Sequence, residues 1–291
     1  MKRTTVGIAV LPETLSASAI EGGGLLLGAA EVARGGDLRA DAGALLAALG
    51  GKVPAVARGK VRAAIGWGGP SVLAVVETNG AGGKARDAAV RSALEAEAGR
   101  SLDGWRIAWA PESGRKSGKV LAGAVPEDEL LSVNAAALAA GGEVVGADLL
   151  PLVLLNAIQA ADKEREASAL VVLLPGSVSL FLLVGATRRV APTLCRHRWL
   201  NGGDTEDRAE TEILRGLVAW EGLQGAAPKR MDLIVVGGSG RFADGIAEKV
   251  AVPVREAAID EIVRRTMRGK KPADALSGLS CLAVIVARSA L

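Results

Sequence analysis

The chain has 291 residues, of which 49% are hydrophobic and 23% are charged, a composition typical of a soluble globular protein. Its formal net charge is only +3, and its basic residues are spread out except for brief clusters at Arg115-Lys116 and Lys270-Lys271. Nucleic-acid binding usually needs a basic stripe with aromatic platforms, so the composition disfavours that class of function.

Short apolar runs bounded by glycine or proline predict strands in the first half of the chain, and Ala-rich runs with apolar residues at helical spacing predict helices. Leu25–Val32 fits either a third strand or the start of a helix. The other predicted strands are Thr4–Leu11, Leu15–Ile20, Val61–Ile65, Val72–Val76, Trp105–Ala110, Lys119–Val125 and Val144–Ala147. The predicted helices are Asp37–Leu49, Asp87–Ala98, Pro126–Ala140 and Leu150–Ala161.

Residues 167–187 contain no charged side chain and are long enough to span a bilayer as a helix. Pro175-Gly176-Ser177 stands in the middle of this segment, however, and breaks any helix there. Ser177 and Ser179 alternate with apolar residues, as in a strand. We therefore predict two buried strands joined by a tight hairpin, in preference to a membrane span.

The rest of the second half again alternates between strands and helices. A strand is expected within Arg188–Arg198, and later strands are predicted at Leu233–Val236 and Val252–Arg255. The helices are predicted at Asp204–Gly222, Phe242–Lys249, Ile259–Met267 and Ala275–Ala287. Because strand hairpins open both halves, the pattern predicts an α/β chain with two similar lobes.

A glycine-rich turn, Gly237-Gly238-Ser239-Gly240, joins a predicted strand to a predicted helix. Glycines at such a place let a ligand approach the backbone, and the N–H groups that start the helix can bind an anion. A tight turn without a ligand explains the same residues equally well, so both interpretations stay open. Residues 114–119 do not form a Walker A loop, because only three residues separate the two glycines.

The two cysteines, Cys195 and Cys281, lie far apart in different sequence contexts. A disulfide framework is therefore not predicted, and a reducing cytoplasm fits this usage better. His197 is the single histidine, and with no second cysteine nearby it is interpreted as a core or surface residue. No metal site is predicted. No signal peptide is expected either, because Glu13 and Glu21 interrupt the segment that follows the basic start.

Several segments, taken in order, carry a resemblance to a known family. They are Lys119–Gly141 (KVLAGAVPEDELLSVNAAALAAG), Asp148–Ala161, the turn at Pro175-Gly176-Ser177, Leu200–Thr205, the helix Glu206–Glu221, Leu233–Gly240 and Val252-Pro253-Val254. This series resembles the actin-like pilus assembly proteins called PilM, and the related cytoplasmic part of the type II secretion protein GspL. The likeness runs from Val6 to near the C-terminus.

The resemblance implies an actin-like (ribonuclease H-like) two-lobed α/β fold with an inserted small subdomain. The implied division gives residues 1–52 and 146–165 to the first lobe, 53–145 to the inserted subdomain, 166–272 to the second lobe, and 273–291 to a C-terminal helix that returns to the first lobe. The residues that would hold a nucleotide are those of the two turns, namely Pro175, Gly176, Ser177, Gly237, Gly238, Ser239 and Gly240.

The chain departs from the pattern of the family members that bind ATP. Those members carry an acidic residue at the end of the first strand, in a Gly-Ile-Asp-Ile-Gly type pattern. Here Ala9 stands at the acidic position and Leu11 at the final glycine, while Leu173 and Leu174 occupy the entry to the second hairpin. Ala and Leu cannot hold Mg²⁺ or orient a water molecule. We therefore expect no hydrolysis and no required cofactor, while residual ATP binding at Gly237–Gly240 stays open.

The resemblance implies a bacterial structural component of a type IV pilus or type II secretion assembly platform, a pseudo-ATPase rather than an enzyme. It would be cytoplasmic and peripheral to the inner membrane, through the cytoplasmic N-terminal tail of a single-span membrane partner. The peptide groove would border Val53–Gly142, where Trp67, Trp105 and Trp109 are either core residues or interface anchors. The alternative is an active ATP-dependent kinase or ATPase of the sugar kinase–actin superfamily, which would need acidic residues in both phosphate loops.

Overall fold

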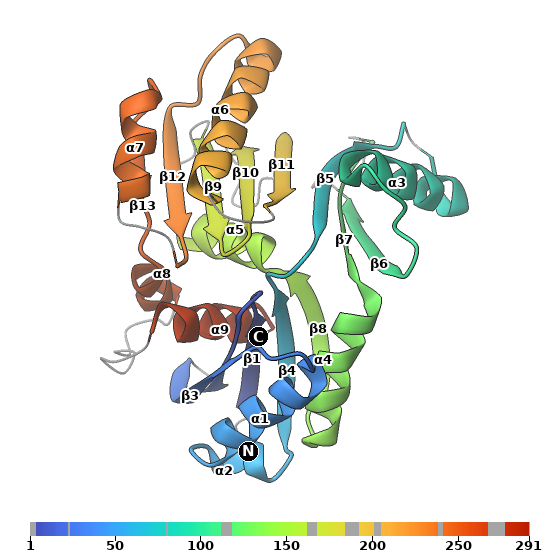
Figure 1. Ribbon diagram of the computed structural model, residues 1–291, viewed down its shortest axis with the longest axis vertical. Coiled ribbons are helices and arrows are strands. Elements are labelled where there is room, and N and C mark those ends of the chain that lie inside the picture. The colour runs from blue at the N-terminus through green and yellow to red at the C-terminus, as the bar shows by residue number, and fades with distance from the viewer. Residues whose placement is uncertain are drawn as a thin grey trace. The chain divides into compact units, whose positions relative to one another are not determined.

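A computed structural model describes residues 4–22, 24–79, 81–111, 118–161, 168–183, 192–200, 205–237, 241–266 and 277–290 (Figure 1). The chain divides into two compact units. The first unit consists of residues 1–69, 128–162 and 258–291, and the second consists of residues 70–127 and 163–257.

The first unit is built on a five-stranded mixed sheet. Its strands are β1 (Thr4–Val10), β2 (Thr14–Glu21), β3 (Leu25–Ala33), β4 (Val61–Trp67) and β8 (Glu143–Leu149), in the spatial order β3-β2-β1-β4-β8. β2 runs antiparallel to β1 and β3, whereas β4 is parallel to β1 and to β8. β1 is buried along its whole length, as a central strand covered on both faces must be.

Helices cover both faces of this first sheet. α9 (Gly278–Ser289) packs against β1, β2 and β4, and Figure 1 shows it in red beside the blue β1. The hydroxyl of Ser18 donates to the carbonyl oxygen of Ser280 over 2.9 Å, which fixes the start of α9 on β2. α1 (Leu38–Gly50) packs against β2 and β3. The remaining helices here are α2 (Pro54–Ala57), α4 (Glu127–Ala139), which begins at the unit boundary, α5 (Leu150–Ala161) and α8 (Ile259–Thr266).

The second unit contains a five-stranded sheet with the same arrangement. Its strands are β9 (Ser168–Leu174), β10 (Ser177–Leu183), β11 (Leu194–Trp199), β12 (Arg230–Val235) and β13 (Val254–Glu256), in the spatial order β11-β10-β9-β12-β13. β10 is antiparallel to β9 and β11, and β12 is parallel to β9 and β13. Two antiparallel connections followed by two parallel ones therefore occur in both sheets, which confirms the prediction of two similar lobes.

Two helices cover one face of the second sheet, α6 (Thr205–Gln224) and α7 (Arg241–Lys249). Their buried residues Ile213, Trp220 and Phe242 join a hydrophobic core with alternate residues of β9, β10 and β12. Gly216 lets α6 approach this sheet closely, because a Cβ at that position would overlap the side chain of Leu180. The apolar stripe of α6 thus packs against the apolar residues of the strands, which explains why this helix covers the second sheet.

A three-stranded antiparallel sheet completes the second unit. It consists of β5 (Val72–Glu77), β6 (Trp105–Pro111) and β7 (Lys119–Pro126), in the order β5-β7-β6. α3 (Gly83–Ala98) packs on one face, where Val90 and Leu94 are fully buried. β5 also lies against β11 of the larger sheet.

The structure confirms the predicted order of strands and helices, and it shows that Leu25–Val32 is a strand. Residues 168–183 form the expected buried hairpin. No helix in the described part of the chain is long and apolar enough to cross a membrane. The three-stranded sheet occupies residues 72–126, whereas β4 and β8 pair within the first sheet. The sequence-based division that begins a subdomain at Val53 stays a prediction.

Candidate functional site

The Pro175–Ser177 turn lies beside Gly237, the first residue of the second turn predicted to hold a nucleotide, at the ends of the parallel strands β9 and β12. The backbone N–H of Val236 donates to the carbonyl oxygen of Leu173 over 2.9 Å. A Cβ built on Gly237 would stand 3.4 Å from Cγ of Pro175, so the two turns are in contact range. Gly237 adopts φ 72°, a conformation that glycine accepts readily. Gly238, Ser239 and Gly240 lie outside the described residues.

The indole of Trp199 covers one side of the Pro175–Ser177 turn. A Cβ built on Gly176 would lie 3.2 Å from the Trp199 ring, and Gly176 itself adopts φ 77°. The N–H of Leu200 donates to the carbonyl oxygen of Gly176 over 2.6 Å. Gly176 therefore has a structural explanation that needs no ligand: a left-handed turn packed beneath a tryptophan.

The ends of β1 and β9 carry apolar side chains where the family resemblance implies an acidic residue at Ala9, a glycine at Leu11 and a polar entry at Leu173 and Leu174. Ala9 and Leu11 are 0% and 2% exposed, and Leu173 and Leu174 are equally buried. In the first unit, the Leu11 side chain also packs over Gly68, at the end of the neighbouring strand β4. None of these four side chains offers an oxygen ligand for Mg²⁺.

One carboxyl group does lie at the end of a parallel strand of the first unit. Asp148, near the end of β8, pairs with Gly66 of β4, which in turn pairs with Ala9 of β1. The three residues therefore lie at one level across the sheet. Partial burial of its carboxyl group raises the pKa of Asp148, although more than a third of the residue stays exposed. Among the described residues, no three His, Cys, Asp or Glu side chains are close enough to hold a metal ion.

A buried histidine bridges two parts of the second unit. His197 on β11 is 4% exposed, and its Nδ1 lies 2.8 Å from Oγ of Ser179 on β10. Its Nε2 lies 3.1 Å from Oγ of Ser71, at the start of β5. Burial lowers the pKa of His197 to about 4, against the smaller opposing effect of a hydrogen bond with the Ser71 backbone, and the nearby Arg198 lowers it further. The imidazole is therefore neutral at physiological pH and fully bonded, as the interpretation of a core histidine requires.

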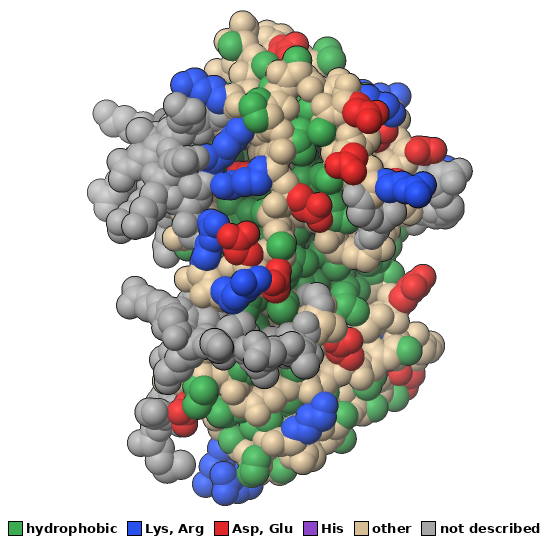
Figure 2. Space-filling model, turned by 90° about the vertical axis from the view of Figure 1, so that its left-hand side faces the viewer, with side chains coloured by type: hydrophobic (Ala, Val, Ile, Leu, Met, Phe, Trp, Pro, Cys, Tyr) green, Lys and Arg blue, Asp and Glu red, His purple; other side chains and the backbone are tan. Residues whose placement is uncertain are grey.

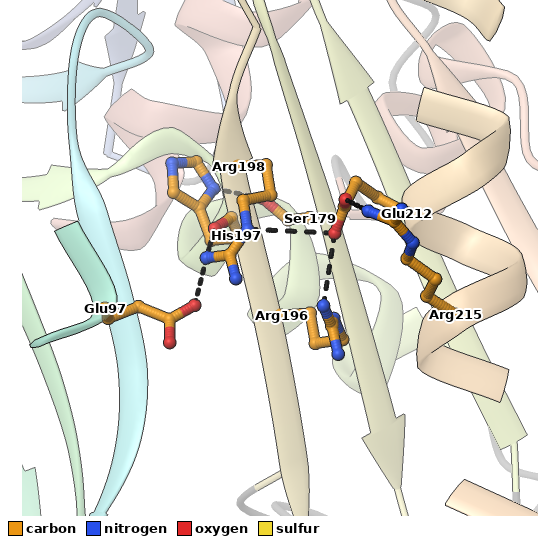
Figure 3. Close-up of polar contacts among 7 residues, drawn as sticks. All are labelled: Glu97, Ser179, Arg196, His197, Arg198, Glu212 and Arg215. Atoms are coloured by element: carbon orange, nitrogen blue, oxygen red, sulfur yellow. Dashed lines mark hydrogen bonds and ion pairs between the residues drawn. The ribbon is translucent and has the colours of Figure 1, made fainter. Parts of the chain in front are cut away.

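The opposite face of β11 carries a cluster of ion pairs (Figure 3). Glu212 on α6 lies 3.2 Å from Arg196, 3.7 Å from Arg198 and 2.9 Å from Arg215. Arg198 also pairs with Glu97 at the end of α3. β11 is thus held by hydroxyl groups on one face and by carboxylates on the other.

The three tryptophans of the predicted groove region have different environments. Trp67 is 1% exposed and belongs to the core of the first unit. Trp105 and Trp109 are half-buried on the face of β6 that packs on α3. The guanidinium of Arg86 lies 5.0 Å above the Trp109 ring, and the indole N–H of Trp109 donates to Asp87 over 3.0 Å. The guanidinium of Arg100 lies 4.8 Å above the Trp105 ring. These contacts explain both half-buried tryptophans as packing residues of the small sheet.

Charges on the surface of the second unit are mixed rather than separated. Figure 2 shows basic and acidic side chains beside one another on the face that carries α7 and β13. Lys249 pairs with Glu210 over 2.6 Å, and Arg255 pairs with Asp232 over 2.7 Å. The described residues of this face therefore present paired charges rather than a basic stripe of the kind that nucleic acid needs.

Sequence reasoning found the two turns but not the contacts of β11. The alternation of Leu-Cys-Arg-His-Arg-Trp over residues 194–199 indicates a two-faced strand, with both arginines on one side. Nothing local in that pattern points to Ser71, which is separated from His197 by more than a hundred residues. The partners of the histidine could be found only from the fold.

No protein-family model and no curated protein matches the sequence. Similar solved structures include the PilM–PilN type IV pilus biogenesis complex, with 17% identity over 89% of each chain and a TM-score of 0.69. They also include a Bacteroides thetaiotaomicron protein with an actin-like ATPase fold, with 11% identity over 91% of this chain and 96% of the other and a TM-score of 0.60. A third is the cytoplasmic domain of EpsL, an inner membrane component of the type II secretion system of Vibrio cholerae.

The EpsL likeness has 10% identity over 92% of this chain and 96% of the other, with a TM-score of 0.55. A polyphosphate/ATP-glucomannokinase is also among the similar structures. At such identities the likeness establishes the fold. The chain has the actin-like ATPase fold, and its structure resembles those of PilM and the cytoplasmic domain of EpsL.

Proposed function

We propose that this protein is a structural component of a bacterial type IV pilus or type II secretion assembly platform, and that it works by binding rather than by catalysis. It would act in the cytoplasm, at the inner membrane, by holding the short cytoplasmic N-terminal tail of a single-span membrane protein. The likeness to the PilM–PilN complex over 89% of both chains carries this proposal.

The chemistry at the strand ends supports the absence of catalysis. Phosphoryl transfer in this fold depends on metal ions that carboxylates position. Buried Ala9 and Leu11 supply none at the end of β1, and buried Leu173 and Leu174 supply none at the end of β9. The ring of Trp199 also stands against Gly176, on one side of the turn that would face a phosphate group. The four apolar side chains at the ends of β1 and β9 support the proposal of a pseudo-ATPase.

The three-stranded sheet offers a place for an extended tail. β6 is an edge strand, since it pairs only with β7 in that sheet. Arg106, Ala108 and Ala110 are exposed, on the face of β6 opposite to α3. An extended peptide can add to such an edge through main-chain hydrogen bonds, while small side chains leave room for its own side chains. We therefore place the tail along β6.

Peptide titration into the full chain tests the binding proposal. Synthetic tails of single-span inner-membrane proteins encoded beside this chain would be titrated by calorimetry. We expect one tail to bind, and Ala108→Asp to weaken that binding at least about tenfold by placing a charge beside the edge. The control is Ala139→Asp, an exposed alanine at the end of α4 in the other unit, which should bind as the parent does. Equal binding by both variants would exclude β6.

The rival function is an ATP-dependent kinase or ATPase, and one observation favours it. Asp148 is a partly exposed carboxyl group at the end of β8 with a raised pKa, as a general base would have. A phosphate-release assay with Mg²⁺–ATP separates the two functions. We expect release at the protein-free background for the parent and for Asp148→Asn. Turnover that disappears in Asp148→Asn would establish the rival instead.

A further inference from the structure

β11 contacts the three-stranded sheet through its middle residues. His197 meets Ser71 at the start of β5 over 3.1 Å, and Arg198 pairs with Glu97 at the end of α3. One contact is a buried hydrogen bond and the other a half-exposed ion pair, and they leave β11 on opposite faces. The small sheet and its helix are therefore each tied to β11 by a specific side chain.

The far end of the same strand holds the Pro175–Ser177 turn. Trp199 pairs with Ser177 in the strand register, and its ring stands against Gly176. The next residue, Leu200, donates its N–H to the carbonyl oxygen of Gly176 over 2.6 Å. Any displacement of β11 along or across the sheet would therefore move the groups that define the shape of this turn.

Buried hydrogen bonds connect the small sheet to β10, the strand that begins at the turn. The imidazole of His197 joins Oγ of Ser71 to Oγ of Ser179, and Ser179 lies two residues after Ser177 on β10. Ser71, Ser179 and His197 are 6%, 0% and 4% exposed, so water cannot replace these bonds easily. Close-packed interiors shift as connected pieces rather than deform gradually, so the small sheet and the turn are expected to move together.

We propose that β11 couples the three-stranded sheet to the Pro175–Ser177 turn, so that occupation of the small sheet alters the conformation of the turn. The coupling is a property of the folded chain and needs no bound ligand. Through this coupling, binding of the tail at β6 would be transmitted to the turn. That role of the coupling rests on the proposed function. By reciprocity, a ligand held at the turn would then change the affinity for the tail by the same factor.

Amide hydrogen exchange measured by NMR on the full chain tests the coupling. Ser71→Ala removes one end of the histidine bridge without touching the turn. We expect the Leu200 amide, which donates to Gly176, to exchange about tenfold faster, as loss of one buried hydrogen bond implies. The Val236 amide, which donates to Leu173 on the other side of β9, should keep its rate. The matched control is Ser101→Ala, an exposed serine of the same unit that bonds only locally to Asp103.

Two results would overturn the coupling: faster exchange confined to residues 195–198 with Leu200 unchanged, or equal acceleration of Leu200 and Val236. Glu97→Gln serves as a second variant should Ser71→Ala fail to fold, because it weakens the other tie from a half-exposed position. Addition of the tail peptide then tests the use of the coupling. The peptide should shift the Leu200 amide resonance in the parent protein. The same resonance should keep its position in Ser71→Ala. Absence of any peptide binding would reject the proposed function while leaving the exchange result intact.

Discussion

Gly7 of β1 lies directly against Ala283 of α9: a Cβ built on Gly7 would overlap the carbonyl oxygen of Ala283 and the backbone nitrogen of Ala287. The helix therefore rests on strand backbone at this point, with no side chain between them. Gly66 on β4 repeats the arrangement, since a Cβ there would overlap the side chain of Val286. Two glycines on neighbouring strands set the distance of α9 from the first sheet.

Gly7→Ala is expected to destabilise the protein by about 1–3 kcal/mol, because the added methyl group must push α9 away from a close-packed sheet. Chemical unfolding in urea measures the change. Gly43→Ala is the control, since Gly43 lies within α1 and a Cβ there would meet nothing within 4 Å. It should stabilise the helix by up to about 1 kcal/mol. Equal effects of the two substitutions would contradict the packing argument.

The stability of the second unit should fall in acid because of His197. The pKa of His197 is about 4 in the folded protein and 6.5 when unperturbed. Between these values the unfolded chain binds a proton that the folded chain does not, so stability is complete above pH 6.5 and declines as the pH falls to about 4. The loss attributable to this residue is about 3 kcal/mol.

His197→Gln isolates this contribution, since carboxylates that titrate in the same range are common to both proteins. The variant should be less stable at pH 7, because Gln cannot reproduce both hydroxyl contacts. The difference between the two proteins should then shrink as the pH is lowered to 4.5. Urea unfolding midpoints at several pH values provide the measurement, and parallel curves would show that the imidazole does not stay neutral in the fold.

Glu212→Gln should cost about 1–2 kcal/mol of unfolding free energy, because it leaves Arg196, Arg198 and Arg215 without their shared counter-charge in a partly buried site. The comparison is Glu210→Gln on the same helix, whose partner Lys249 is half exposed. That change should cost clearly less than Glu212→Gln, because water and salt screen an ion pair at the surface. Urea unfolding at low and at high salt concentration measures the change in unfolding free energy of both variants. A Glu210→Gln effect as large as that of Glu212→Gln would refute the distinction.

Gly176→Ala and Gly225→Ala together separate backbone strain from side-chain contact. Both glycines have left-handed backbones, at φ 77° and φ 71°, so alanine costs about 1–2 kcal/mol at either position. Only Gly176 has a neighbour, the Trp199 ring. The Gly176→Ala variant should therefore be the less stable of the two, with an altered tryptophan emission spectrum. Identical stabilities would mean that the ring does not rest on the turn.

The sequence predicted features whose causes are local. Pro175 and Gly176 interrupt an uncharged segment, and the strands on either side are uniformly apolar, so the hairpin could be recognised without knowledge of the rest of the chain. The turn at Gly237 followed from its glycines in the same way. Even the resemblance to PilM depended on the order of such local features.

The contacts that the sequence did not predict join distant segments. The sequence around Ser71 and His197 does not indicate that they form a hydrogen bond, because a serine and a histidine are compatible with many environments. The burial of Trp67 depended on the placement of β4 beside β1, which short apolar strands of this kind do not specify. The packing of Trp199 on Gly176 required the pairing of β10 with β11 as well as the turn itself.

The position of α9 has a consequence for how the protein is made. The strands β1, β2 and β4 of the first sheet are formed by residues 4–67, yet the helix that covers them is formed by residues 278–289. On the ribosome, that apolar face stays uncovered until residues 278–289 have been synthesised, whereas residues 70–127 and 163–257 have already emerged and can assemble their own sheets. A nascent chain that stalls before Ser277 would present the bare face of the first sheet to chaperones.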